Sequence, residues 1–251
     1  MNRWTGRVAL VTGASVGIGA AVCRALVAHG MKVVGAARNV DKIQALADEL
    51  KDHPGSLMAV RCDVSKDADI MDMFADIKRM HGGVDACINN AGISYSQNLL
   101  EGTPDQWREM MNVNVVGLCL CTREAVASMR ARGVDDGQII HVNTMSGHRV
   151  IPSNASYFYA ASKFAVTAVT EGLRQELREL KTNIRVAGIS PGVVETDFHI
   201  HLKGDVEARK LYESMECIQP KDMADSIVHI LSAPKHVQIH DILLRPTQQP
   251  L

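Results

Sequence analysis

A glycine-rich turn near the start of the chain constrains the fold more than any other stretch. Residues 8–11 (VALV) form an apolar, β-branched run, which is typical of a strand buried on both faces of a parallel sheet. Residues 12–19 (TGASVGIG) follow, and a helical pattern then continues to Gly30. A strand, a glycine-rich turn and a helix in this order let the backbone approach a pyrophosphate and direct a helix N-terminus at it. A tight turn that binds no ligand would have the same glycines. The next strand therefore has to show whether this turn binds a dinucleotide.

The second strand bears on the cofactor that such a turn would hold. Residues 32–39 (KVVGAARN) form this strand and its exit. Binders of NAD place an acidic residue here, where it accepts a hydrogen bond from the ribose 2′-hydroxyl. This chain has Ala37 followed by Arg38, so no carboxylate repels a 2′-phosphate and a guanidinium is placed to pair with it. The pattern favours NADP(H) as the cofactor. The alternative is that Arg38 is an exposed arginine that binds no ligand.

Strand and helix patterns alternate along the whole chain. We expect seven strands, at residues 8–11, 32–39, 57–61, 86–88, 138–142, 184–189 and 239–245. We also expect Asn39 to cap the helix after the second strand, and Thr103 to form a capping box with Gln106. The alternation predicts a single doubly wound, Rossmann-type α/β domain over residues 1–251, with a parallel sheet of about seven strands flanked by helices. The mixed, charged segment 197–215 is expected to be a mobile lid over the substrate.

Polar and small residues follow several of these strands at the point where each strand ends. Asp63 lies at the end of the third strand, where its carboxylate is able to accept from an adenine amino group. The fourth strand ends in Asn89 to Gly92, where amides and small residues suit a backbone that passes close to a cofactor, although an ordinary turn has the same composition. The fifth strand ends in Thr144 and Ser146, whose hydroxyls face the same edge of the sheet.

Three further residues suggest acid–base chemistry. Tyr159 and Lys163 are four residues apart, so on a helix they occupy the same face. A phenol has a reference pKa of about 10, which an adjacent ammonium group is expected to lower toward the range of a working proton donor. Asn114 is a poor mid-helix residue, and beside Gly117 it indicates a local kink or a functional amide. Taken alone, the tyrosine and lysine would fit an ordinary amphipathic helix equally well.

Composition limits which binding partners and which cellular compartment are expected for this chain. The formal net charge of −1 gives no reason to expect nucleic acid or an anionic membrane as a partner. Six cysteines lie scattered without a CxxC pair, so we expect reduced thiols in an intracellular protein. No signal peptide is recognised, and no apolar run approaches the ~18 residues of a membrane span, so the expected location is cytoplasmic. His199 and His201 lack a third ligand, so we expect surface histidines and no metal.

Five motifs together resemble those of the short-chain dehydrogenase/reductase family. They are TGASVGIG (12–19), NNAG (89–92), NVNVVG (112–117), YAASK (159–163) and PGVVET (191–196), and the likeness covers essentially the whole chain. The resemblance implies that Tyr159 is the general acid or base of a carbonyl–alcohol interconversion. It also implies that Lys163 lowers the pKa of this tyrosine and holds the nicotinamide ribose, and that Asn114 anchors a proton-relaying water.

The resemblance also implies a cofactor site for NADP(H). Its glycines cradle the phosphates, Asp63 and Val64 flank the adenine, Asn90 contacts the ribose and Thr196 contacts the nicotinamide amide. The full implied set is Gly13, Ser15, Gly17, Ile18, Gly19, Arg38, Asp63, Val64, Asn90, Ala91, Gly92, Tyr159, Lys163, Pro191, Gly192, Val194 and Thr196.

One catalytic position departs from the family pattern. The family places a serine three residues before the glycine that follows the fifth strand, and this position holds Thr144. Counting back the usual thirteen residues from Tyr159 instead gives Ser146. We favour Thr144, because strand ends fix a position better than loops do. A threonine hydroxyl also donates a hydrogen bond, although its methyl group restricts the side-chain rotamer.

The implied function is an NADP(H)-dependent oxidoreductase that assembles as a homodimer or homotetramer. The loop 143–150 and the chain's last segment are similar to a subgroup that includes hydroxysteroid dehydrogenases and insect farnesol dehydrogenases. The segments expected around a substrate are mostly apolar, which predicts a small hydrophobic carbonyl or alcohol such as a steroid, an isoprenoid or an apolar dicarbonyl. They supply Ile93, Tyr95, Met145, Val150, Ile151, Val193, Phe198, Leu202 and Met215. The alternatives are a non-catalytic cofactor-binding sensor or scaffold, and an epimerase or dehydratase of nucleotide sugars, whose chains are usually longer.

Overall fold

Seven parallel strands form one twisted sheet at the centre of the molecule. The computed structural model describes residues 1–150 and 157–249. The strands are β1 (Val8–Thr12), β2 (Lys32–Ala37), β3 (Ser56–Arg61), β4 (Ala86–Asn89), β5 (Gln138–Val142), β6 (Arg185–Pro191) and β7 (Asp241–Leu244). Their order in the sheet is β3-β2-β1-β4-β5-β6-β7, and every neighbouring pair is parallel. This order reverses between β1 and β4, which is where doubly wound sheets bind their ligands.

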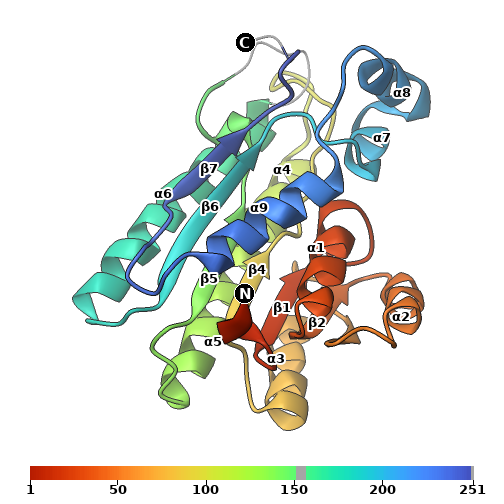
Figure 1. The fold of residues 1–251 in the computed structure, drawn as a ribbon. Coiled ribbons are helices and arrows are strands. Elements are labelled where there is room, and N and C mark those ends of the chain that lie inside the picture. Colours follow the sequence, from red (N-terminus) through yellow and green to blue (C-terminus); the bar gives the residue numbers. More distant parts are fainter. Residues whose placement is uncertain (151–156, 250–251) are drawn as a thin grey trace.

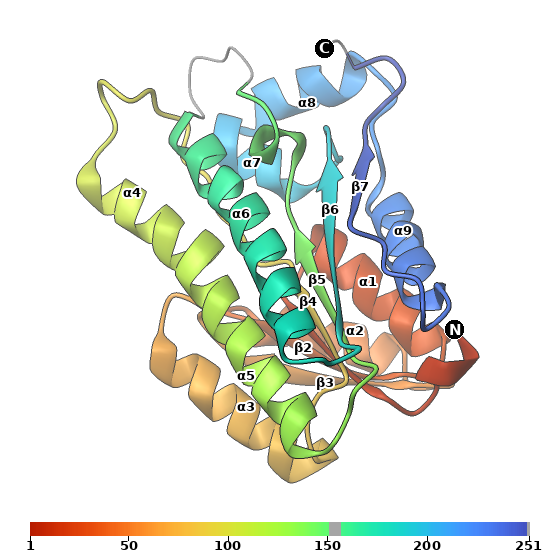
Figure 2. The same cartoon turned by 90° about the vertical axis from the view of Figure 1, so that its left-hand side faces the viewer.

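Helices cover both faces of the sheet (Figure 1, Figure 2). The α-helices are α1 (Gly17–Ala28), α2 (Val40–Glu49), α3 (Asp67–His81), α4 (Pro104–Met111), α5 (Leu118–Ala131), α6 (Tyr157–Glu179), α7 (Asp197–Lys203), α8 (Asp205–Glu213) and α9 (Pro220–Ser232). Short 3₁₀ helices lie at η1 (Asn2–Trp4) and η3 (Met145–Gly147), and the π-helix η2 (Asn112–Gly117) joins α4 to α5. None of the helices in the described part of the chain is long and apolar enough to cross a bilayer.

Two apolar clusters hold the layers together because β-strand side chains alternate between the faces of the sheet. On one face, α1, α2 and α9 pack side chains such as Val22, Ile43 and Ile227 against β1 and β2. On the other face, α3 and α5 contribute residues such as Ile70 and Met129. All five residues of β1 and of β5 are buried, which explains the apolar sequence of β1, whereas β5 also buries the polar side chains of Gln138 and His141.

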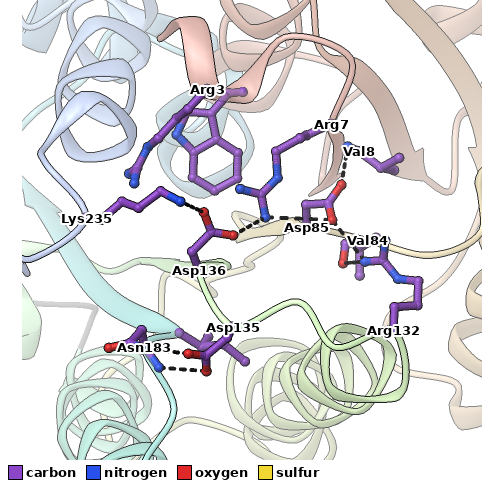
Figure 3. A network of polar contacts seen from close by, with 12 residues as sticks. Arg3, Arg7, Val8, Val84, Asp85, Arg132, Asp135, Asp136, Asn183 and Lys235 are labelled. Carbon is purple, nitrogen blue, oxygen red and sulfur yellow. Dashed lines mark hydrogen bonds and ion pairs between the residues drawn. The ribbon is translucent and has the colours of Figure 1, made fainter.

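An ionic network closes the edge of the sheet opposite the strand carboxyl ends (Figure 3). The carboxylate of Asp85 accepts from the backbone N–H of Val8 at 2.8 Å and lies 3.1 Å from Arg132. Asp136 lies 2.9 Å from both Arg7 and Lys235. These contacts tie β1, the start of β4 and the loop before β5 to the segment after α9, and so leave the other edge of the sheet for the site.

The predicted fold is confirmed, including its details at helix ends. The Asn39 side chain accepts from the N–H of Lys42 at the start of α2, and Thr103 and Gln106 form the predicted capping box. The six cysteines are free thiols, all buried except the half-buried Cys119. The segment 197–215 contains two helices, α7 and α8, at the end of the molecule where the strands finish (Figure 2).

Candidate functional site

The site is assembled where segments leave the carboxyl edge of the sheet. Strand β1 leads into the glycine-rich turn, β4 into residues 90–92, and β5 into η3. All of these segments lie at one edge because the strands are parallel. Helix α6 brings Lys163 to the same edge, where its Nζ donates to the carbonyl oxygen of Val142 at 3.0 Å.

The glycine-rich turn forms a backbone cradle without room for side chains. Gly13 and Gly17 have φ angles of 66° and 55°, a region that favours glycine. A Cβ at Gly13 would lie 2.9 Å from Cα of Ala91, and one at Gly19 would lie 2.2 Å from the carbonyl oxygen of Gly13. This shape, at the N-terminus of α1, fits the pyrophosphate of a dinucleotide. Ser15 and Ile18 are half-buried beside it.

The side chain of Asn90 braces this turn. Its Nδ2 donates to the carbonyl oxygens of Thr12 at 2.9 Å and Gly13 at 3.1 Å. The Thr12 hydroxyl oxygen accepts from the backbone N–H groups of Asn90 and Ala91 at 3.0 and 3.1 Å. Both amide hydrogens of Asn90 are therefore used within the protein, which leaves only its side-chain oxygen for the predicted ribose contact.

Tyr159 and Lys163 lie together on one face of α6, as their spacing predicts. The Nζ of Lys163 is 5.8 Å from the centre of the Tyr159 ring, and a Cβ at Gly92 would lie 3.7 Å from the same nitrogen. Burial lowers the pKa of Lys163 to about 8. Burial also raises the pKa of Tyr159 above its ordinary value, so the expected lowering by the ammonium group is wrong for this structure. Loss of hydration is the cause of this shift, and the phenol remains protonated at neutral pH.

Asn114 lies in the π-helix η2, which confirms the predicted irregularity. Its Oδ1 accepts from the N–H of Ile93 at 2.8 Å, and its Nδ2 donates to the Ile93 carbonyl oxygen at 2.9 Å and to the Ser162 hydroxyl at 3.0 Å. The Ser162 hydroxyl in turn donates to the carbonyl oxygen of Tyr159 at 2.7 Å. The fully buried amide thus joins the loop after β4 to the turn of α6 that carries the tyrosine.

Thr144 and Ser146 both follow the carboxyl end of β5, with Thr144 directly before η3 and Ser146 within it. Thr144 caps η3, where its Oγ1 accepts from the N–H of Ser146 at 3.4 Å. The same hydroxyl donates to the carbonyl oxygen of Pro191, the last residue of β6, at 3.3 Å. A bond of this length is weak, so another acceptor can replace it. Both side chains are half-buried.

Helix α7, in the segment 197–215, lies beside the tyrosine. The ring centres of Phe198, in α7, and Tyr159 are 5.7 Å apart. Thr196 caps α7 by accepting from the N–H of Phe198 at 3.4 Å, and its carbonyl oxygen accepts from the Tyr212 hydroxyl at 2.6 Å. These contacts fix the start of α7 against α8 and place an aromatic wall beside the phenol.

The remaining residues of the PGVVET motif connect β6 to α7. The N–H of Gly192 donates to the Leu244 carbonyl oxygen at 2.7 Å, and the buried Val194 forms a parallel bridge with Ile218.

His199 is half-buried, so only part of its ring is at the surface. Its ring centre lies 5.8 Å from that of Tyr212, in an edge-to-face arrangement. Among the described residues, no three or more His, Cys, Asp or Glu side chains form a group able to hold a metal ion.

Two charged residues expected to contact the adenosine half of a cofactor lie beyond β2 and β3. Arg38 is exposed directly after β2. Although burial opposes it, hydrogen bonds from Ser65 and the charge of Arg38 hold the pKa of Asp63 below its usual value. One carboxylate oxygen of Asp63 accepts from the N–H and hydroxyl of Ser65, at 3.1 and 2.7 Å. Val64, next to it, is half-buried against Gly117.

Two features of this edge are not marked by any motif in the sequence. Arg61, at the end of β3, lines a surface depression together with Arg38. His148 Nε2 lies 2.9 Å from the Ser190 hydroxyl and 3.0 Å from a carboxylate oxygen of Asp241, which links the end of η3 to β6 and β7. No sequence motif marks either feature, because each depends on which strands are neighbours in the sheet.

The family and the relatives suggested by the sequence motifs are confirmed by comparison with known proteins. The family model described as short chain dehydrogenase matches residues 7–206. Dehydrogenase/reductase SDR family member 11 of Gallus gallus is 56% identical, over 99% of this chain and 99% of that protein. The Homo sapiens protein of the same name is 55% identical, over 99% and 97%. Farnesol dehydrogenase of Aedes aegypti is 42% identical, over 98% of each chain.

Solved structures share the whole fold. A serine dehydrogenase in a closed form complexed with NADP+ superposes with a TM-score of 0.88 at 29% identity, covering 97% of this chain and 96% of that one. An alcohol dehydrogenase of Thermococcus sibiricus complexed with 5-hydroxy-NADP has a TM-score of 0.85 at 27% identity, covering 98% of each.

Proposed function

Because the chain belongs to the short-chain dehydrogenase family of oxidoreductases, we propose that it transfers hydride reversibly between NADP(H) and a hydrophobic ketone, aldehyde or alcohol. The observation that carries the proposal is the connected group of Tyr159, Lys163 and Asn114 beside the glycine cradle. The names of the similar proteins, and the NADP-type cofactors bound in the similar structures, support the same reaction class.

The cofactor would lie across the strand ends. The backbone of the turn 13–19 would hold its pyrophosphate, and Arg38 would pair with its 2′-phosphate. When bound, NADPH supplies the hydride that is added to the carbonyl carbon.

Proton transfer is the part of the reaction that this chain would carry out. Tyr159 donates its phenolic proton to the carbonyl oxygen as the carbon receives hydride, and the raised pKa of this phenol keeps the proton available at neutral pH. The Lys163 ammonium stabilises the phenolate that is left, and Thr144 donates a hydrogen bond that polarises the carbonyl. Asn114 anchors the water through which the phenolate regains a proton from solvent. Oxidation of an alcohol follows the same steps in reverse.

A hydrophobic substrate is the class that the surroundings of Tyr159 favour. Apolar side chains from three segments lie half-buried or exposed at this edge, so none of them is fully buried in the core. They are Ile93, Tyr95, Met145, Val150, Val193, Phe198, Leu202 and Met215. Ile151 belongs to the same predicted set but lies outside the described residues. Burial against such walls contributes roughly 25 cal/mol per Å² of apolar area, so binding should strengthen with substrate size.

A panel of ketones and aldehydes of increasing apolar area, assayed with NADPH and NADH in parallel, tests this function. We expect turnover with NADPH, and a kcat/KM that rises with apolar size. Equal use of both cofactors would contradict the cofactor assignment, while a flat series or a preference for hydroxy acids or sugars would contradict the substrate class. Cofactor binding without turnover of any carbonyl would favour a sensor or scaffold. The homodimer or homotetramer expected for the family is tested by light scattering on the purified protein.

A further inference from the structure

Two arginines converge at the carboxyl ends of β2 and β3. Ala37, the last residue of β2, pairs with Arg61, the last residue of β3, and Arg38 follows Ala37 directly. Arg38 and Arg61 line one surface depression together with Asn39, Val40 and Asp41. The paired residues of neighbouring parallel strands point to the same face of a sheet, and Ala37 packs in the cluster that contains α2 residues. Arg61 therefore extends on the α2 side, toward the N-terminus of that helix.

Within the described residues, no carboxylate is in ion-pair contact with either guanidinium group, and Arg38 acts on Asp63 only through its charge. Both side chains are exposed, and neither forms a hydrogen bond or an ion pair within the part of the chain that the structure describes. Asp41 is the one carboxylate that lines the depression. By contrast, Arg24 on α1 and Arg79 on α3 are paired with Glu49 and Asp76.

The local backbone adds to the positive potential. The side chain of Asn39 caps α2 by accepting from the N–H of Lys42 at 3.3 Å. The other free N–H groups of the first turn lie at the same end, and the helix dipole makes this end favourable for a negative charge. A depression with two free guanidinium groups and a helix N-terminus suits a dianionic phosphate monoester, since arginine pairs with phosphate through two parallel hydrogen bonds.

We propose that Arg61 is a specificity residue for the 2′-phosphate of NADP(H), which it binds together with Arg38 across the ends of β2 and β3. This inference rests on the proposed function for the identity of the cofactor. It predicts that Arg61 contributes to binding of the 2′-phosphate and does not contribute to binding of the adenosine 5′-phosphate part of the cofactor.

Isothermal titration with two nucleotide fragments tests the assignment without turnover. The probes are 2′,5′-ADP, which carries the 2′-phosphate, and 5′-AMP, which lacks it. Arg61→Ala should weaken 2′,5′-ADP about tenfold or more, because a hydrogen bond to a charged group is lost, and should change 5′-AMP less than about twofold. Arg61→Lys should recover part of the affinity. Arg79→Ala, which removes an exposed arginine on α3, is the matched control and should change neither affinity.

The outcomes separate this inference from the cofactor proposal. If the native protein prefers 2′,5′-ADP and Arg38→Ala weakens it while Arg61→Ala does not, Arg61 has no role and only this inference fails. Equal losses for both fragments in Arg61→Ala would show that the guanidinium stacks on adenine, which also overturns it. If the native protein binds the two fragments equally, the preference for NADP(H) fails and this inference fails with it. Because Arg61 is exposed, thermal unfolding of each variant should match the native protein and confirm that loss of affinity is not loss of fold.

Discussion

At the scale of single residues, the hydroxyl of Tyr159 is expected to be required for proton transfer but not for binding of NADPH. Replacing this tyrosine by phenylalanine removes the proton donor and keeps the ring that packs against Phe198. We expect Tyr159→Phe to bind NADPH with native affinity, measured by quenching of protein fluorescence, and to reduce carbonyls near the background rate. Tyr157 begins the same helix but has no lysine four residues later, so Tyr157→Phe should retain turnover. If Tyr157→Phe were the inactive variant, the motif would have been assigned to the wrong tyrosine.

Thr144 and Ser146 compete for the role of carbonyl-polarising donor. The Thr144 hydroxyl lies at the strand end, where its weak bond to Pro191 leaves it able to donate to a substrate, and this position favours it over Ser146. Removing one donor of this type costs about 2.7–4 kcal/mol, or roughly 10²–10³ in rate. We expect a loss of that size in kcat for Thr144→Val and a much smaller one for Ser146→Ala. The opposite order would mean that spacing to Tyr159, and not the strand end, determines which hydroxyl acts.

Motifs and helical spacing predict which side chains meet at this site better than they predict the pKa values of those side chains. Helical spacing placed Tyr159 beside Lys163, and the structure agrees. The direction of the tyrosine pKa shift could not be predicted, because it depends on burial by surroundings that include Phe198, 39 positions further along the chain. The same limit applies to Asn90: the family resemblance assigns its amide to a ribose, and only the structure shows that both of its hydrogens are bound to the glycine-rich turn.

At the scale of elements, the π-helix η2 depends on a glycine that touches another segment. A Cβ at Gly117 would lie 2.2 Å from the carbonyl oxygen of Val64, which belongs to the loop after β3. Backbone cannot move as easily as a side chain, so Gly117→Ala should lower the free energy of unfolding by about 1–3 kcal/mol. Urea unfolding followed by circular dichroism measures the change.

Gly172 in α6 supplies the control, because nothing outside its own helix lies within 4 Å of a Cβ at that position. Gly172→Ala should raise the free energy of unfolding by about 0.5–1 kcal/mol through helix propensity. Equal effects of the two substitutions would show that the contact between η2 and Val64 does not constrain the π-helix.

At the scale of the whole molecule, the sequence predicts where the strands lie along the chain better than it predicts which strands are neighbours in the sheet. Each buried run was located within about two residues, because continuous apolar segments bounded by turns are a strong signal. Which strands pair is a tertiary property, however, and Arg61 and Arg38 meet only because β2 and β3 are adjacent in register. The contact of His148 with Ser190 and Asp241 likewise joins three elements that no local pattern connects.

A buried histidine in the centre of the sheet makes stability depend on pH. His141, in β5, is fully buried between the hydroxyls of Thr122 and Thr170, at 3.0 and 2.8 Å. Burial, together with the charges of Lys163 and Arg174, lowers its pKa from 6.5 to about 3. Below pH 6.5 the unfolded chain therefore binds a proton that the folded protein does not, and stability falls as the pH falls. Since each pKa unit corresponds to about 1.36 kcal/mol, this residue should remove about 2–3 kcal/mol between pH 6.5 and 4.5.

Urea unfolding at half-unit pH steps tests this origin of acid sensitivity. Carboxylates whose pKa is lowered in the folded protein, such as Asp135 and Asp136, lose their contribution only near and below their usual value of 3.8, so they do not act in the upper part of this window. Burial also lowers the pKa of His81, which adds a smaller slope of the same sign. His141→Asn should be less stable than the native protein at pH 7.5 but should lose most of the slope between pH 6.5 and 4.5. His53→Asn, which changes an exposed histidine, should keep the native slope, and a slope retained in His141→Asn would place the titrating group elsewhere.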